Sequence, residues 1–233
     1  MNDVTAIPVR GIPEIRPGDD LVPVLRDAIR AGGVLLQNGD IVAVTQKIVS
    51  KAEGRVVPEG PGGRDAWVAL ETRRVVARRD DMVVAETRHG FVCANAGVDR
   101  SNAGAPDTVV LLPLDPDASA ARIRDEIAKR ARATVAVVIT DTFGRAWREG
   151  HTNVAIGIAG LPALKRYIGQ RDPEGYELRV TEIAVADEIA AAAELVMGKL
   201  DRCPVAIVRG LSFEDSDETA QEYVRPAARD MFR

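Results

Sequence analysis

Short apolar runs separated by polar turns recur along the whole chain, and their spacing predicts an alternation of strands and helices. The most apolar run covers residues 134–141, where five consecutive aliphatic residues precede Thr140 and Asp141. This run predicts a fully buried strand that ends abruptly at the Asp141 carboxylate. A second buried strand is expected at residues 41–45. Shorter strands are expected at residues 4–9, 83–87, 91–94, 108–112, 178–180 and 205–208.

Other segments have the spacing or composition of helices. Leu21, Leu25 and Ile29 share one face of a helix that begins after the turn at residues 17–20. The segment at residues 67–79 reads as a basic amphipathic helix with a solvated charged face. Two more helices are expected at residues 117–132 and 183–199, and the second is rich in alanine, a strong helix former.

The order of these elements mixes strand–helix alternation with pairs of neighbouring strands. That order argues against a purely parallel, doubly wound sheet. We therefore expect an α+β fold of mixed sheets with flanking helices, formed by residues 1–233 as a single domain. Residues 59–63, with the sequence EGPGG, are too few for a linker between domains and predict a loop instead.

Charge and cysteine content exclude several classes of partner. The chain carries 31 Lys and Arg against 35 Asp and Glu, a balance that leaves no electrostatic footprint for duplex nucleic acid. Cys93 and Cys203 are too few and too far apart for a zinc pattern. The N-terminus lacks a signal-peptide pattern, and no apolar run is long enough to span a bilayer. We therefore expect a cytoplasmic protein with no nucleic-acid and no membrane partner.

The residues that follow the most apolar run carry the clearest candidate chemistry. Asp141 and Thr142 place oxygen ligands at the predicted strand exit, where a sheet fixes their position. A carboxylate held in this way commonly binds a divalent cation against a phosphate chain. Arg145 and Arg148 follow directly and face the same anion in this interpretation. In the alternative interpretation, which the sequence supports equally, both are surface arginines.

Further candidates each have a structural alternative. Asp99 lies in a turn rich in small and amide residues, and it is either a second metal-binding carboxylate or part of an Asx turn. Lys47 and Lys51 follow a buried strand and either cradle phosphate oxygens or remain solvated. His89 and His151 lack helical metal spacing, so each is expected to be a hydrogen-bonded structural residue, with anion contact as the alternative for His89. No P-loop, dinucleotide glycine motif or nucleophile elbow occurs, so a nucleotide site here requires another geometry.

Several segments, in order over nearly the whole chain, together resemble one family, the coenzyme F420-0:L-glutamate ligases, also called F420 gamma-glutamyl ligases. The matching segments are residues 11–14 (GIPE), 16–20 (RPGDD), 39–40 (GD), 48–55 (IVSKAEGR), 86–99 (ETRHGFVCANAGVD), 101–102 (SN), 112–113 (LP), 115–119 (DPDAS), 141–145 (DTFGR), 180–187 (VTEIAVAD) and 208–210 (VRG). A coincidence of this length and order is far more specific than any short motif.

The resemblance implies a GTP-dependent ligase that joins L-glutamate to the 2-phospholactate end of coenzyme F420-0, a deazaflavin. An acyl phosphate is the implied intermediate, and F420-1 or longer gamma-glutamyl tails are the implied products. Two alternatives stay open: a ligase of the same fold that acts on a different carboxylate acceptor, and a non-catalytic guanine-nucleotide-binding module.

By resemblance, the GTP contacts are expected at Ile12, Pro13, Glu14, Ile15, Gln46, Lys51 and Asn102. Asp99 and Asp141 match carboxylate ligands of one divalent ion, and Thr142 matches a ligand of a second. The expected cofactors are therefore two Mg²⁺ or Mn²⁺ ions, with K⁺ as a further candidate. Asp141, Arg145 and His89 are the expected catalytic residues, the last two as holders of the anionic acceptor or of glutamate.

The resemblance also implies intertwined lobes and a homodimer whose active site lies near the subunit interface. The chain is most similar to the ligase half of a bacterial two-domain relative, and no C-terminal reductase domain is expected in it. Lys199 stands where archaeal relatives often carry an acidic or amide side chain, which bears on the second metal ion.

Overall fold

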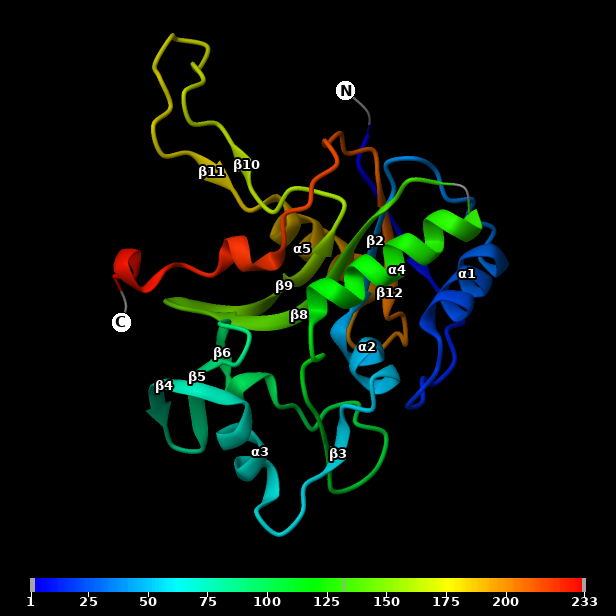
Figure 1. Cartoon of the computed structure of the whole chain (residues 1–233), viewed down its shortest axis with the longest axis vertical. Coiled ribbons are helices and arrows are strands. Elements are labelled where there is room, and N and C mark those ends of the chain that lie inside the picture. Colours follow the sequence, from blue (N-terminus) through cyan, green and yellow to red (C-terminus); the bar gives the residue numbers. More distant parts are fainter. Residues whose placement is uncertain (1–2, 132, 232–233) are drawn as a thin grey trace.

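A five-stranded mixed sheet forms the centre of the computed structural model, which describes residues 3–131 and 133–231 (Figure 1). Only the β2–β8 pair is parallel within this sheet, and its other three pairs are antiparallel. The predicted α+β fold with mixed sheets is therefore confirmed. In spatial order the strands are β1 (Thr5–Val9), β12 (Val205–Arg209), β2 (Ile41–Thr45), β8 (Ala136–Arg145) and β9 (Arg148–Ala159).

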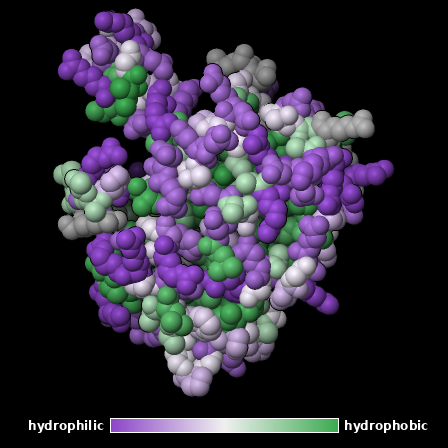
Figure 2. Space-filling view, viewed as in Figure 1, coloured by the Kyte–Doolittle hydropathy of each residue, from purple (hydrophilic) through white to green (hydrophobic). Residues whose placement is uncertain are grey.

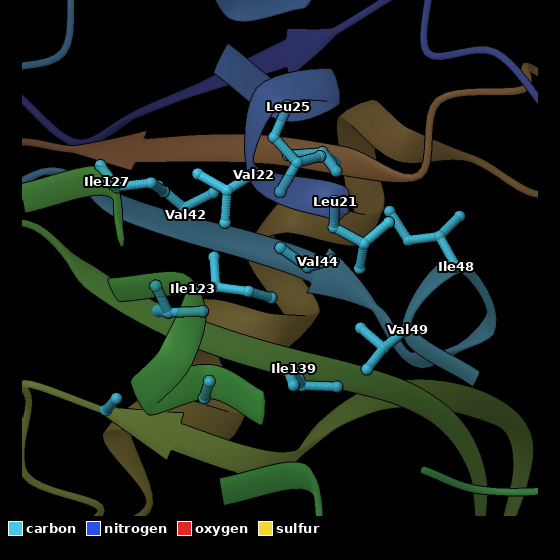
Figure 3. Packing of buried hydrophobic residues seen from close by; sticks show 14 of the residues in the cluster. Leu21, Val22, Leu25, Val42, Val44, Ile48, Val49, Ile123, Ile127 and Ile139 are labelled. Atoms are coloured by element: carbon cyan, nitrogen blue, oxygen red, sulfur yellow. The ribbon is translucent and has the colours of Figure 1, made fainter. Parts of the chain in front are cut away.

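Helices cover both faces of this sheet, because successive residues of its central strands point to opposite sides. Val42 and Val44 of β2 and Ile139 of β8 lie in a cluster with α1 and α4, and Figure 3 shows their side chains between those elements. Ile41 and Val138 point the other way and pack against α5. The helices are α1 (Leu21–Ala31), α2 (Gln46–Ala52), α4 (Pro116–Ala131) and α5 (Val185–Met197).

Sequence signals fix the start of α1 closely. The carboxylate of Asp20 accepts a hydrogen bond from the backbone N–H of Val22 at 3.1 Å, which caps the helix. Leu21, Leu25 and Ile29 then face the core, as their spacing predicted. The helix predicted at residues 183–199 is confirmed as α5, which spans Val185–Met197. It begins two residues later than predicted, because residues 182–183 form strand β11.

Three smaller units flank the main sheet. A three-stranded sheet of β4 (Thr72–Arg79), β5 (Met82–Thr87) and β6 (Val92–Ala94) packs with α3 (Gly63–Glu71) around its own apolar cluster. β3 (Val56–Pro58) pairs with β7 (Thr108–Val110). β10 (Lys165–Arg166) and β11 (Glu182–Ile183) form the base of an arm that projects from the body (Figure 1). Short 3-10 helices lie at Asn95–Gly97, Ala220–Tyr223 and Ala227–Arg229.

The prediction of one helix over residues 67–79 is wrong, because α3 ends at Glu71 and the chain continues as β4. The arginines of β4 have a role in this strand. Arg74 Nε donates to the buried carboxylate of Glu86 on β5 at 3.2 Å, and Arg73 lies 3.5 Å from the same carboxylate. Two register irregularities in the β4–β5 pair break the regular alternation of the strand. The charged residues therefore do not follow a period of two, and their spacing resembles that of a helical face. The strand expected at residues 178–180 is also wrong, since those residues carry no strand.

The predicted strand end at Asp141 is wrong as well. β8 continues to Arg145 and turns back as β9, a strand that the sequence did not predict. Asp141 therefore lies within a long hairpin, paired with Val154. β9 was missed because its first half is polar, with four of its first five residues exposed. Polar residues without a buried face do not alternate with apolar residues, so they give no strand signal.

The surface seen in Figure 2 is dominated by hydrophilic residues, with apolar residues in small separate areas. The projecting arm is mostly hydrophilic in the same view. Among residues 3–131 and 133–231, no helix combines the length and the apolar character needed to cross a membrane.

Candidate active site

Asp141 is surrounded by charged groups that come from separate parts of the chain. The pKa of its carboxyl is raised to about 6, mainly by burial and in smaller part by the nearby negative charge of Asp99. The backbone N–H of Thr142 and the ammonium groups of Lys47 and Lys199 oppose this shift. The fold thus brings two carboxylates that are 42 positions apart in sequence into one electrostatic site. A carboxylate in this situation is stabilised by any additional cation.

Asp99 has a different environment, although it belongs to the same site. Lys47 Nζ lies 2.7 Å from Asp99 Oδ2. Ser101 donates its backbone N–H to Oδ1 at 2.8 Å and its hydroxyl to Oδ2 at 2.7 Å. Burial alone would raise the pKa of Asp99, but these hydrogen bonds outweigh it and hold the pKa below its usual value. The Asx turn and the cation-binding interpretations of Asp99 are therefore compatible, because the turn presents an ionised carboxylate.

Thr142 faces the opposite side of the hairpin from Asp141, because neighbouring residues of a strand alternate. Its hydroxyl donates to Asn153 Oδ1 at 2.7 Å and accepts a hydrogen bond from Lys199 Nζ. Asn153 in turn donates to Glu194 Oε2 at 2.9 Å. The Thr142 hydroxyl thus belongs to a network with α5 and with the residues that follow this helix.

Two of the nucleotide residues expected from the resemblance, Glu14 and Lys51, are in direct contact. Lys51 Nζ forms an ion pair with Glu14, which joins α2 to the segment before α1. A Cβ added at Gly104 would lie 3.8 Å from Glu14 Oε1, so the loop after Asn102 passes the same carboxylate. Gln46 is buried and accepts a hydrogen bond from Ser50 Oγ at 2.8 Å. Ile12, Pro13 and Ile15 lie in the same segment as Glu14, and Ile15 is buried.

Oxygen donors dominate this region, which fits a hard divalent cation such as Mg²⁺ or Mn²⁺. Asp99 and Asp141 supply two carboxylates. No group of three or more His, Cys, Asp and Glu side chains that would suit a metal occurs within the described ranges. Phosphate oxygens and water would therefore have to complete the coordination shell, as is usual for Mg²⁺ bound with a nucleotide.

The match to known proteins includes the carboxylate pair, Asp99 and Asp141, and the Glu14–Lys51 ion pair. The F420-0:gamma-glutamyl ligase family matches residues 11–60 and 64–210. The chain belongs to this family. Its sequence is 39% identical to the coenzyme F420:L-glutamate ligase of Methanothermobacter thermautotrophicus, with 99% of each chain covered. It is also 39% identical to the enzyme of that name from Methanopyrus kandleri, over 94% of each chain. The corresponding enzyme of Archaeoglobus fulgidus is 37% identical over 99% of this chain and 96% of the relative.

Two of the catalytic residues expected in this gamma-glutamyl ligase, Arg145 and His89, form hydrogen bonds with backbone carbonyl groups. Arg145 follows Asp141 by four residues along an extended strand, a separation of roughly 13 Å, and its guanidinium donates to the Glu149 carbonyl at 2.9 Å. His89 Nε2 lies 2.9 Å from the carbonyl oxygen of Pro113 and 3.2 Å from that of Leu114, which makes it the protonated nitrogen. The catalytic roles of Arg145 and His89 stay predictions. In this structure both side chains form hydrogen bonds with backbone carbonyl oxygens.

Asn153 and Glu194 form a hydrogen-bond network with Thr142, although the sequence gave no reason to select them. Both contact Thr142 or its partner through side chains, from β9 and α5. Asn153 is the first buried residue of β9, because the residues before it are exposed or half-buried. The signal that could have identified it is the pairing of residues 142 and 153 across the hairpin, which requires the missed strand β9.

Proposed function

We propose that this chain is a GTP-dependent ligase that joins L-glutamate to coenzyme F420-0 through an acyl phosphate. The observation that supports this most directly is the convergence of Asp99 and Asp141, beside Lys47 and next to the Glu14–Lys51 pair, in a member of the gamma-glutamyl ligase family. The names of the archaeal relatives supply glutamate and F420 as substrates.

The proposed chemistry has two steps. An oxygen of the acceptor carboxylate attacks the γ-phosphorus of GTP, the bond from that phosphorus to the β–γ bridging oxygen breaks, and GDP leaves. The neutral amine of glutamate then attacks the acyl carbon, a C–N bond forms, and the C–O bond to the phosphate breaks. Inorganic phosphate leaves and the amine loses a proton. Phosphorylation is needed because a carboxylate at neutral pH is a poor acceptor for an amine.

In this proposal the residues of the chain bind and orient rather than form covalent bonds. A divalent cation held by Asp99 and Asp141 would neutralise the charge of the phosphate oxygens during transfer. Lys51 would contact the phosphates from the neighbouring helix, and residues 12–15 together with Gln46 and Asn102 would hold the nucleoside. Thr142 is proposed to contact a second cation, which would have to compete with the Lys199 ammonium for the threonine hydroxyl.

Mass spectrometry of F420-0 incubated with GTP, glutamate and either Mg²⁺ or Mn²⁺ tests this function. We expect a product heavier by one glutamyl residue or more, and its mass reports the acceptor, the tail length and the metal requirement together. Asp141→Asn should abolish the product. Asp125→Asn is a matched control, because Asp125 is an exposed carboxylate on α4.

Two results would contradict the proposal in different ways. GTP turnover that does not depend on F420-0, but does depend on another carboxylate, would favour a ligase with a different acceptor. Tight GDP binding without any metal-dependent product would favour a non-catalytic nucleotide-binding module.

We also propose a homodimer, as the family resemblance implies. Sedimentation equilibrium at micromolar concentration would give about twice the chain mass of 25.0 kDa if this is right. A single species at the mass of one chain would contradict it.

A further inference from the structure

A cavity of about 310 Å³ lies next to Asp141, and its lining includes none of the residues proposed to bind nucleotide or metal. One wall is the β8–β9 hairpin, which contributes Phe143 and Val154. The opposite wall is the segment around Tyr223 and Val224, which runs beside β9 (Figure 1). Phe91, just before β6, contributes to a third side. The volume is at the lower end of the range typical for small-molecule sites, about 300–1,000 Å³.

The register of the hairpin ties this cavity to the carboxylate pair. Val154 is the direct cross-strand partner of Asp141, and directly opposite residues share one face of a sheet. Phe143 is two residues beyond Asp141 and lies on the same face, at a distance of roughly 7 Å along the strand. A molecule seated against Phe143 and Val154 therefore has one end beside Asp141.

The walls suit a flat conjugated ring with polar edges. Phe91, Phe143 and Tyr223 contribute aromatic surface and Val154 and Val224 contribute branched aliphatic surface. The charged lining consists of Asp187, Arg225 and Asp230. The carboxylate of Asp187 accepts a hydrogen bond from the backbone N–H of Ala155 at 2.8 Å. An apolar slot with few polar groups fixes the orientation of a ring whose edge carries N–H groups.

The nucleotide base is a poor occupant of this cavity on geometric grounds. Its proposed contacts at Glu14 and Lys51 lie on α2 and on the segment before α1. The cavity instead lies between the β8–β9 hairpin and the segment around Tyr223. The two groups have no residue in common.

We propose that this cavity is the acceptor subsite, which holds the deazaflavin ring while the phospholactate end extends to Asp141. The proposal rests on the ligase function proposed above and adds to it the place where the acceptor is recognised. Its consequence is that ring binding and nucleotide binding use separate residues.

Fluorescence titration with the deazaflavin nucleoside, which has the ring but no phospholactate, tests ring binding without metal or GTP. Phe143→Ala removes an aromatic wall and Val224→Trp fills the cavity. We expect each to weaken ring binding at least tenfold while GDP affinity stays unchanged. Phe213→Ala and Val196→Trp are matched controls, because these half-buried residues pack on the other face of the main sheet, and both should bind the ring as the unmodified protein does.

The circular dichroism melt of each variant shows whether it is folded. Phe143→Ala enlarges the cavity and Val224→Trp fills it, so the test can still be read if one of the two variants fails to fold. Ring affinity within twofold of the unmodified protein in whichever of them folds would overturn the proposal. So would displacement of the ring by GDP, which would assign the cavity to guanine. Ligation with an unchanged KM for F420-0 in Phe143→Ala would refute the subsite alone. Ring binding that depends on Phe143 in a protein that never ligates would refute the ligase function and leave the subsite standing.

Discussion

The ammonium of Lys47 lies 2.7 Å from the carboxylate of Asp99. Lys47 therefore stands where a cation bound to Asp99 would have to approach, and it also lowers the pKa of Asp141 through its charge. The site thus holds a positive group at its carboxylates without any metal. A divalent cation that arrives with a nucleotide would release Lys47 from Asp99 and leave it free to contact phosphate oxygens.

We expect Lys47→Met to strengthen Mn²⁺ binding in the absence of nucleotide and to weaken GTP binding in its presence. Exposed ion pairs contribute about 0.2–1 kcal/mol, which corresponds to a change of roughly 1.4- to fivefold in Mn²⁺ affinity. Electron paramagnetic resonance of free Mn²⁺ measures the first effect and calorimetry the second. Lys129→Met is the control, because Lys129 pairs with Glu126 on the surface of α4. Unchanged Mn²⁺ affinity in Lys47→Met would show that the lysine does not compete with the cation.

Asp141 gives a pH dependence whose sign follows from its raised pKa. The folded carboxyl has a pKa of about 6 against an ordinary value of 3.8, mainly because it is buried. The folded protein therefore binds this proton more tightly than the unfolded chain does, and the free energy of unfolding falls as pH rises from about 4 to about 6. Above pH 6 the whole cost of burying the charge is present.

We therefore expect Asp141→Asn to raise the free energy of unfolding by about 1–3 kcal/mol at pH 7.5 in EDTA. The gain should shrink toward zero at pH 4, where the Asp141 carboxyl of the folded unmodified protein is protonated and therefore uncharged like the amide of the variant. Urea denaturation at several pH values measures it, with Asp125→Asn as the exposed control. An equal difference between variant and unmodified protein at both pH values would contradict the raised pKa.

Local patterns predicted those elements whose stabilising contacts are close in sequence or buried on both faces. Residues 41–45 were predicted as a strand with the bounds of β2, because all but the last are fully buried. The start of α1 followed from Asp20 and the residues after it. In contrast, β4 was predicted as part of a helix. Its arginines Arg73 and Arg74 pair with Glu86 of the neighbouring strand β5, a contact that local sequence does not reveal.

The carboxylate pair shows the same limit at the level of the site. Asp141 attracted attention by itself because it follows an apolar run, whereas the turn around Asp99 had an adequate local explanation. Their proximity depends on β6 packing near β8, a contact between segments far apart in the chain. The residues alone left this pairing as one of two interpretations of Asp99, and the family resemblance favoured it. Asn153 and Glu194 were missed because their role depends on a strand pairing that local patterns did not reveal.

Asn153 links two elements through hydrogen bonds from both ends of its amide, to Thr142 on β8 and to Glu194 on α5. Its side chain is buried, so Asn153→Ala leaves two polar groups without their partner. We expect a loss of about 1–3 kcal/mol in the free energy of unfolding. His151→Ala, at an exposed position two residues earlier on β9, should change it by less than about 0.5 kcal/mol. A loss in Asn153→Ala no larger than in the control would contradict the network.

Lys51 is the lysine most restricted by its surroundings, because it is largely buried and paired with Glu14. A buried ammonium at the nucleotide side of the site would interact with phosphate in a medium that screens charge less than water does. We expect Lys51→Met to weaken GDP binding at least tenfold, about 1.4 kcal/mol, while binding of the deazaflavin nucleoside stays unchanged. Isothermal titration calorimetry measures GDP affinity, and Lys129→Met again provides the exposed control. Equal GDP affinity in Lys51→Met and the unmodified protein would place the phosphates elsewhere, and a parallel loss of ring binding would point to a folding defect.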